Sequence, residues 1–194
     1  MRNLGEGAGG AEGDDEVVAI RSDDQDAVLL LHGAGGYDED RQLAAKIGVA
    51  AGVPVRVPRL PEDDLSYTAW SEAIAGELAR LEPGAVVLGH SFGASILLRV
   101  LAQTPSDVGG AVLLAMPHWG AEGWDVADYA FEGPVPSVPL VMHHCRDDDI
   151  VPIEHLDLNA AQLPSAIVRE HSFGGHQLAG LGAAIARDIA AVAQ

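Results

Sequence analysis

Ser91 stands in the segment GHSFG (residues 89–93), directly after the apolar run 85–88 and directly before a helical pattern. A serine hydroxyl is a weak nucleophile until a neighbouring base takes its proton. A sharp strand-to-helix turn would expose that hydroxyl, and it would crowd the backbone two residues to either side, where glycine fits best. Gly89 and Gly93 occupy those two positions. The spacing therefore predicts nucleophilic chemistry at Ser91.

A candidate base and several candidate acids follow Ser91 in the chain. His176 comes after two glycines, between the last apolar run and the C-terminal helical pattern, which suits a base carried on a loop. Asp147, Asp148 and Asp149 follow an earlier apolar run. An acid of this kind holds the imidazole of the base in one tautomer. The residue types and their order therefore predict a serine, an acid and a histidine that act together.

Short apolar runs alternate with longer helical patterns along most of the chain. Most of these runs are continuously apolar, which is typical of strands covered on both faces. The strand candidates are residues 17–20, 27–31, 53–57, 85–88, 111–116, 139–142 and 166–168. The helix candidates are residues 39–51, 70–81, 92–103, 153–162 and 178–192. This alternation predicts an α/β fold: a three-layer α/β/α sandwich with a mostly parallel sheet of about six to seven strands.

The candidate catalytic residues all follow the carboxyl ends of predicted strands. In open parallel sheets, ligands bind at the carboxyl ends of the strands. The segments that directly follow candidate strands are 32–36, 89–93, 116–119, 146–149 and 174–176. They contain the serine, the acids and the histidine, so we expect one site built from these loops.

The turn GHSFG and the order serine, acid, histidine resemble the α/β-hydrolase superfamily. The resemblance covers the chain from about residue 16 to its end, and its short loops look like the small cap-less serine hydrolases and esterases. It implies an α/β-hydrolase fold without a cap domain, with Ser91 as nucleophile and His176 as base. His171 is the second choice for the base. The histidines interpreted as packing or surface residues are His90, His118 and His155.

The resemblance also indicates the acid. In this family the acid commonly follows the strand before last and stands three residues ahead of a Val-Pro-like pair. The segment RDDDIVP (residues 146–152) puts Asp148 at that place. Asp147 and Asp149 remain alternatives, and Asp125 and Asp128 are less favoured back-up acids.

The segment HGAGG (residues 32–36) resembles the family's oxyanion loop. A tetrahedral intermediate needs two backbone donors about 3 Å from its oxygen. Ala34 and Phe92 are the predicted N–H donors, and the dipole of the helix after Ser91 would add to their effect. His32 is interpreted as a structural residue.

The loop between the candidate strands 111–116 and 139–142 is unusually aromatic. It holds four of the nine aromatic residues of the chain: Trp119, Trp124, Tyr129 and Phe131. Family members often insert a helical cap here, but this loop is too short for one. These four side chains are predicted to bind substrate as an apolar wall, and ordinary packing against the sheet is the alternative.

The composition of the chain limits the kinds of molecule that it is expected to bind. The formal net charge of −18 would repel nucleic acid and anionic membrane surfaces. No apolar run approaches the roughly 20 residues that cross a bilayer, and the first residues lack a signal pattern. Cys145 is the only cysteine, which excludes an internal disulfide. We therefore expect a cytoplasmic protein, monomer or homodimer, whose partner is a small-molecule ester and neither nucleic acid nor membrane.

Two other motifs are assigned no function. Residues 5–10 match the dinucleotide pattern GxGxxG, but no strand precedes them and no helix follows. They fall in the glycine- and acid-rich segment 1–15, a predicted flexible lead-in to a single hydrolase domain over 16–194. A metal site built from His143, His144, Cys145 and the aspartates after them is an alternative, yet adjacent strand residues point to opposite faces, so the two histidines could not easily share one ion. We expect no cofactor and no metal.

The sequence therefore predicts a serine hydrolase that cleaves a small carboxylic ester or thioester through an acyl-enzyme intermediate. A small-ligand sensor on a hydrolase fold, inactive or limited to a single turnover, is the alternative. Chemistry on peroxides or carbon–carbon bonds, which uses the same triad in related families, ranks below ester hydrolysis.

Overall fold

The computed structural model describes residues 28–193. The strand candidate 17–20 and the lead-in 1–15 with its glycine motif lie outside this range. Within it, six parallel strands form one sheet in the order β2-β1-β3-β4-β5-β6. The strands are β1 (Val28–Leu31), β2 (Val55–Arg56), β3 (Val86–His90), β4 (Gly110–Leu114), β5 (Leu140–Cys145) and β6 (Ile167–His171). The predicted parallel sheet is confirmed.

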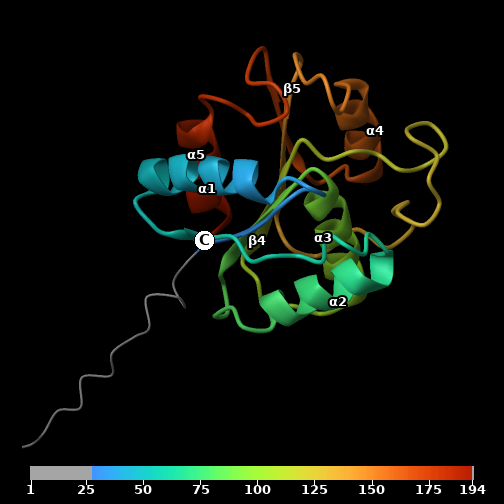
Figure 1. Cartoon of the computed structure of the whole chain (residues 1–194), viewed down its shortest axis with the longest axis horizontal. Coiled ribbons are helices and arrows are strands. Elements are labelled where there is room, and N and C mark those ends of the chain that lie inside the picture. The colour runs from blue at the N-terminus through green and yellow to red at the C-terminus, as the bar shows by residue number, and fades with distance from the viewer. Residues whose placement is uncertain (1–27, 194) are drawn as a thin grey trace, which may run out of the picture.

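Helices cover both faces of the sheet (Figure 1). They are α1 (Tyr37–Ala51), α2 (Tyr67–Leu78), α3 (Phe92–Gln103), α4 (Glu154–Gln162) and α5 (Gly182–Val192). Helices α1 and α5 pack together on one face, while α2 and α3 lie against each other on the opposite face. The fold is therefore the expected three-layer α/β/α sandwich.

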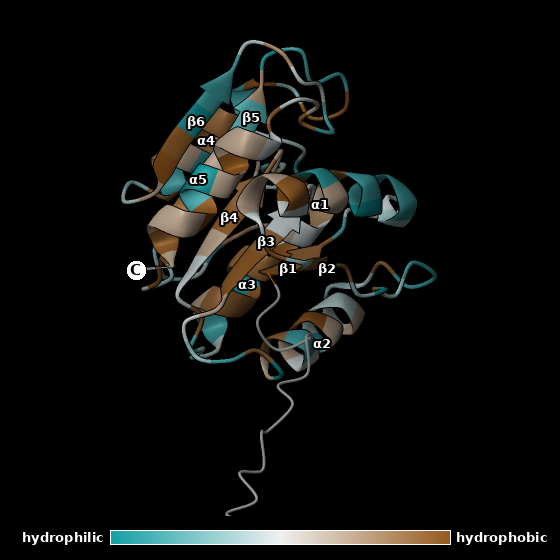
Figure 2. Cartoon of the chain, turned by 90° about the vertical axis from the view of Figure 1, so that its left-hand side faces the viewer, coloured by the Kyte–Doolittle hydropathy of each residue, from teal (hydrophilic) through white to brown (hydrophobic). Residues whose placement is uncertain are grey.

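Two hydrophobic cores result from the alternation of side chains along the strands. In β1, Leu29 and Leu31 belong to the core under α2, α3 and α4, while Val28 and Leu30 belong to the core under α1 and α5. Figure 2 shows the hydrophobic strands in the middle of the molecule. Continuously apolar runs are needed because both faces of each central strand are buried.

Two elements differ from the expectation. β6 was expected to be covered on both faces, but Ile167 and Val168 are 44% and 41% exposed. Among residues 28–193, β6 is an edge strand that pairs with β5 alone, so its apolar side chains are less protected. Helix α5 begins at Gly182, later than predicted, because Leu178 and Gly180 have φ angles of 48° and 83°. These values are incompatible with a right-handed helix.

Residues 115–139, between β4 and β5, form neither a helix nor a strand. The chain therefore has no helical cap at this place, as the length of the loop predicted. None of the helices between residues 28 and 193 is both long and apolar enough to cross a lipid bilayer.

A histidine pair, of which His143 is buried and His171 partly exposed, joins β5, β6 and α5. His143 Nδ1 lies 3.0 Å from His171 Nε2, and the two rings stack. His143 Nε2 lies 3.1 Å from Asp188 Oδ2, and Asp188 also accepts two hydrogen bonds from Arg169. Burial is the main cause that lowers the pKa of His143 from its usual 6.5 to about 4; the charge and hydrogen bond of Asp188 oppose this shift, and the charges of His171 and Arg169 add to it.

This shift predicts a loss of stability in acid. Between pH 6.5 and 4 the unfolded chain binds a proton at His143 that the folded chain does not, so the free energy of unfolding falls as the pH falls. The expected loss is about 3 kcal/mol between pH 7 and pH 4. Urea unfolding of wild type and His143→Gln, measured at both pH values, isolates this contribution. A pH dependence equal in the two proteins would contradict the prediction.

Candidate active site

The turn at Ser91 has the conformation that the glycine spacing predicted. Ser91 connects β3 to α3 with φ 51° and ψ −121°, in a region that L-residues rarely adopt. A Cβ atom on Gly89 would lie 2.5 Å from Ala94 Cα, and one on Gly93 would lie 2.4 Å from His32 O. Both contacts are with backbone, so neither position has room for a side chain.

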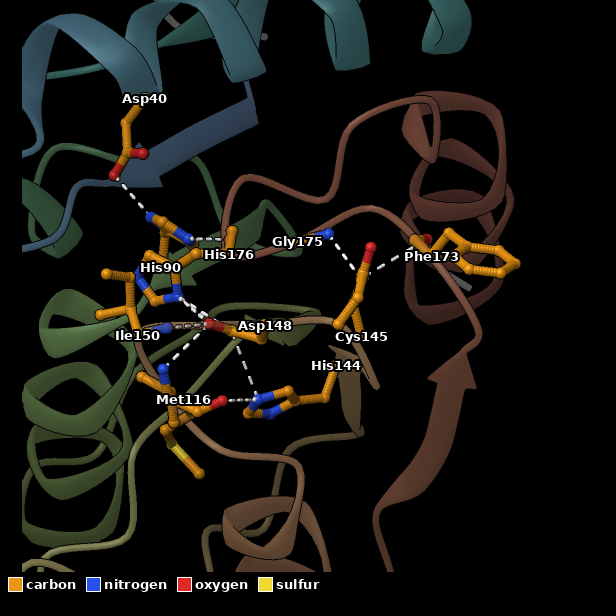
Figure 3. A network of polar contacts seen from close by, with 12 residues as sticks. Asp40, His90, Met116, His144, Cys145, Asp148, Ile150, Phe173, Gly175 and His176 are labelled. Atoms are coloured by element: carbon orange, nitrogen blue, oxygen red, sulfur yellow. Dashed lines mark hydrogen bonds and ion pairs between the residues drawn. The ribbon is translucent and has the colours of Figure 1, made fainter.

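Asp148 and His176 form a hydrogen-bonded pair (Figure 3). His176 Nδ1 lies 2.9 Å from Asp148 Oδ2 and 3.1 Å from Oδ1. The N–H groups of Ile150 and Val151 each donate to Asp148 Oδ1 at 2.9 Å. Burial alone would raise the pKa of Asp148, but hydrogen bonds from His144, His176 and these two N–H groups hold it well below its usual range. Asp148 is therefore an ionised acceptor that orients the imidazole of His176.

His144 supports this carboxylate from the other side. Its side chain is buried, and its Nε2 lies 2.8 Å from Val151 O and 3.4 Å from Asp148 Oδ2. His143, the preceding residue, faces Asp188 on α5 instead. The two adjacent histidines thus point to opposite faces of the sheet, as the strand geometry predicted.

The alternative acids and base do not form the pair with His176. Asp147 accepts hydrogen bonds from the N–H groups of Gly174 and Gly175 at 3.2 and 2.8 Å, so it anchors the loop that carries His176. Asp149 is exposed, and His171 is turned towards His143. Asp125 and Asp128 lie in the loop after β4. Among the candidates, Asp148 makes the contact with His176.

The imidazole of His176 lies beside the residue that precedes the nucleophile. Its ring centroid is 4.7 Å from that of His90. Within residues 28–193, Ser91 Oγ makes no hydrogen bond with His176. Such contacts are often long in free enzymes and tighten only when substrate is bound.

A family model for serine hydrolases matches residues 39–183, which include Ser91, Asp148 and His176. The match covers more than half of the chain. The chain belongs to the serine hydrolase family. No match to this serine hydrolase was found among the curated proteins.

Solved structures share the fold of this serine hydrolase at low sequence identity. The ydeN gene product of B. subtilis has a TM-score of 0.67 at 19% identity, over 87% of this chain and 98% of that one. A lipase-esterase related protein from Clostridium acetobutylicum has a TM-score of 0.67 at 11% identity, over 88% and 96%. A structure from work on the metagenome-derived lipolytic enzymes LipS and LipT has a TM-score of 0.63 at 18% identity, over 86% and 92%. These likenesses establish the α/β-hydrolase fold.

The predicted oxyanion loop of the serine hydrolase lies against its nucleophile. A Cβ atom on Gly33 would be 3.1 Å from Ser91 Cβ and 3.6 Å from Ser91 Oγ. Ala34 follows in the same loop and is exposed to solvent. Phe92 is the first residue of α3, where helix N–H groups have no intrahelical acceptor. Phe92 therefore follows Ser91 directly, and Ala34 follows the glycine that lies against it; the roles of both residues as donors stay a prediction.

The aromatic loop of the serine hydrolase packs around Phe92. Trp119 and Tyr129 contact the Phe92 ring edge-on, with centroids 5.8 and 4.8 Å away, and Trp124 contacts Trp119 at 4.8 Å. Trp119 Nε1 donates to Ser95 Oγ at 2.8 Å. Phe131 is partly buried and packs against the same core. Much of this cluster is therefore structural packing, and its contact with substrate stays a prediction.

Sequence reasoning missed one part of the site. Asp40, on the first turn of α1, is fully buried and contacts His90, which had been interpreted as a packing or surface residue. A signal was present, because Asp40 shares the spacing of Leu43, Ala44 and Ile47 on the buried face of α1. A charged residue on such a face must have a buried partner.

Proposed function

We propose that this serine hydrolase cleaves small carboxylic esters or thioesters through a triad of Ser91, His176 and Asp148. The observation that carries the proposal is the hydrogen-bonded pair of Asp148 and His176, held at the edge of the sheet where the strained Ser91 turn lies. A carboxylate that accepts a hydrogen bond from Nδ1 of an imidazole leaves Nε2 as the atom that accepts a proton. The pair thus supplies the base that a serine nucleophile requires.

In the first half of the reaction, Ser91 Oγ bonds to the acyl carbon while its proton moves to His176 Nε2. The carbonyl electrons move onto oxygen, where the N–H groups of Ala34 and Phe92 stabilise the negative charge. Asp148 stabilises the imidazolium without taking its proton. When the intermediate collapses, His176 gives the proton to the departing alcohol or thiol, and Ser91 carries the acyl group.

The second half repeats these steps with water. His176 Nε2 takes a proton from a water molecule, whose oxygen bonds to the acyl carbon. The bond from the acyl carbon to Ser91 Oγ then breaks, and His176 returns the proton to Ser91 Oγ. The products are a carboxylic acid and the free enzyme.

An ester is the favoured substrate because an activated serine hydroxyl attacks an acyl carbon, and because the aromatic loop offers apolar surface to a small acyl or alcohol group. The loop over residues 115–139 has no cap helix, and Trp124 is 39% exposed beside the partly buried ring of Trp119. Such rings would bind the acyl or alcohol part by apolar contact. Proteins of the same fold include a lipase-esterase related protein and lipolytic enzymes by their descriptions.

A fluorophosphonate probe and a series of short-chain nitrophenyl esters test this proposal. We expect the probe to label Ser91 with loss of fluoride, as read by mass spectrometry of the peptide, and each enzyme molecule to turn over many esters. Ser91→Ala should not be labelled. Ser137→Ala, which removes an exposed serine of the loop before β5, serves as the control and should be labelled like wild type.

Other outcomes decide against the proposal in different ways. A single slow turnover per molecule, with labelling of Ser91, would favour a ligand sensor built on the hydrolase fold. Labelling that persists in Ser91→Ala, or no labelling of the folded wild type, would overturn the assignment of Ser91 as nucleophile.

A further inference from the structure

His90 has an acceptor at each of its two ring nitrogens. It is the last residue of β3, next to Ser91, and it is 1% exposed. Nδ1 lies 2.8 Å from Asp40 Oδ2, and Nε2 lies 2.9 Å from the carbonyl oxygen of His176. Figure 3 shows His90 between these two groups. The proposed mechanism gives His90 no role.

The protonation state of His90 follows from these partners. A carbonyl oxygen can only accept, so Nε2 must carry a proton to make a hydrogen bond with His176. A carboxylate also only accepts, so Nδ1 must carry one as well. A neutral imidazole has a single N–H and would leave one nitrogen lone pair facing an oxygen at hydrogen-bond distance. Both contacts are therefore satisfied when His90 is an imidazolium and Asp40 is ionised.

The surroundings favour this ion pair over the neutral pair. Burial alone would lower the pKa of His90, but the hydrogen bond and charge of Asp40, the His176 carbonyl and the charge of Asp148 together raise it. Burial would raise the pKa of Asp40, but His90 and the N–H of Gly33 together lower it. Asp40 faces His90 from α1, Asp148 from the loop after β5, and His176 from the loop before α5.

We propose that His90 is protonated in the resting protein, and that this imidazolium links the His176 loop to α1 and so positions His176 beside Ser91. The ion pair connects three segments of the site, because Asp40 Oδ2 also accepts the N–H of Gly33 at 2.8 Å. One carboxylate thus holds the oxyanion loop and, through His90, the loop that carries the base. His90 is a positioning residue, since it contacts the backbone of His176 and no reacting atom.

The His176 loop needs such a tether because its own backbone is not regular. Gly174 and Gly175, directly before His176, have φ angles of 143° and 58°. Asp147 holds the N–H groups of these glycines, while His90 holds the carbonyl at the end of the segment. Loss of the second tether removes the side-chain donor that holds the His176 carbonyl, while Asp147 still holds the glycines before it and Asp148 still holds its ring.

A dependence on pH follows, with a definite sign. The imidazolium persists above the usual pKa of a histidine, so the tether is intact in neutral solution and is lost as the pH rises through the raised pKa of His90. The expected result is an alkaline limb in the pH profile of kcat that reports His90.

Histidine-selective ¹⁵N NMR tests the charge of His90 without reference to activity. At pH 7.5 we expect both His90 nitrogens to carry protons in wild type, and Asp40→Asn to leave only one of them protonated. A His90 signal with one bare nitrogen in wild type would overturn the proposal. So would an imidazolium that survives unchanged in Asp40→Asn.

Kinetics test the positioning role, which rests on the proposed function. In His90→Gln we expect kcat for the nitrophenyl esters to fall about 100-fold with little change in KM, because misplacement of a base by about 1 Å has this order of effect. The alkaline limb should disappear. His143→Gln, another change of a buried strand histidine, is the control and should keep both kcat and the limb.

The remaining outcomes are distinguishable. A His90→Gln protein of lower melting temperature but with wild-type kcat and an unchanged alkaline limb would mean that His90 is only structural, and it would overturn the proposal. Wild type that hydrolyses no ester would contradict the proposed function, while the NMR experiment would still decide the charge of His90.

Discussion

Replacing Ser91 with alanine is expected to lower kcat/KM for a nitrophenyl ester by about 10⁶-fold, the order found when the nucleophile of a Ser-His-Asp triad is removed. The acyl-enzyme cannot form without Oγ, and what survives is stabilisation of the oxyanion by backbone N–H groups. Initial rates of the purified variant, with active-site titration to exclude wild-type contamination, measure the effect. A fall of less than tenfold would mean that another group is the nucleophile.

Substitution of Ser91 is also expected to change the stability of the protein, because the backbone at this residue is strained. A non-glycine residue at φ 51° and ψ −121° carries about 1–3 kcal/mol of backbone strain. Alanine keeps this strain, whereas glycine relieves it and loses roughly 0.5–1 kcal/mol to the greater freedom of the unfolded chain. Ser91→Gly should therefore be more stable than Ser91→Ala by about 1 kcal/mol.

Urea unfolding of these two variants compares proteins that are both inactive, so activity does not bias the result. Equal stability of Ser91→Gly and Ser91→Ala would mean that the turn stores no strain. A more stable Ser91→Gly would mean that the turn that exposes the nucleophile holds residue 91 in a strained backbone conformation, and that this strain lowers the stability of the protein.

Replacing Asp148 with asparagine is expected to lower kcat by about 10⁴-fold, as for the equivalent change in another Ser-His-Asp triad. The carboxylate accepts the proton on His176 Nδ1 at 2.9 Å. An amide can instead donate to Nδ1, which stabilises the tautomer whose Nε2 already carries a proton and cannot act as a base. KM should change far less than kcat.

The neighbouring aspartates supply matched controls for this change. Asp149→Asn alters an exposed side chain and should keep kcat within about threefold of wild type, because exposed substitutions away from special contacts have small effects. Asp147→Asn removes charge from the group that holds Gly174 and Gly175, so its effect should lie between the other two. If Asp149→Asn lost more activity than Asp148→Asn, the assignment of the acid would be wrong.

The sheet was predictable from the sequence because its strands are buried on both faces. The run around Leu29 to Leu31 is continuously apolar for that reason, and each of its residues contributes to one of two cores. β6 was harder to interpret, because an edge strand keeps an apolar sequence while Ile167 and Val168 are exposed. The start of α5 was placed too early, since side-chain spacing carries no information on the φ angles of Leu178 and Gly180.

By itself, the sequence determined the family, the α/β layering and the turn at Ser91, because these depend on local patterns: apolar runs, helical spacing and two glycines at a fixed distance from a serine. Only the tertiary structure decided which aspartate meets His176. Asp147, Asp148 and Asp149 are chemically identical neighbours, and their directions depend on hydrogen bonds to the loops after β5 and β6. The link from Asp40 through His90 to His176 was equally hidden, since its members lie 50 and 86 residues apart in the chain.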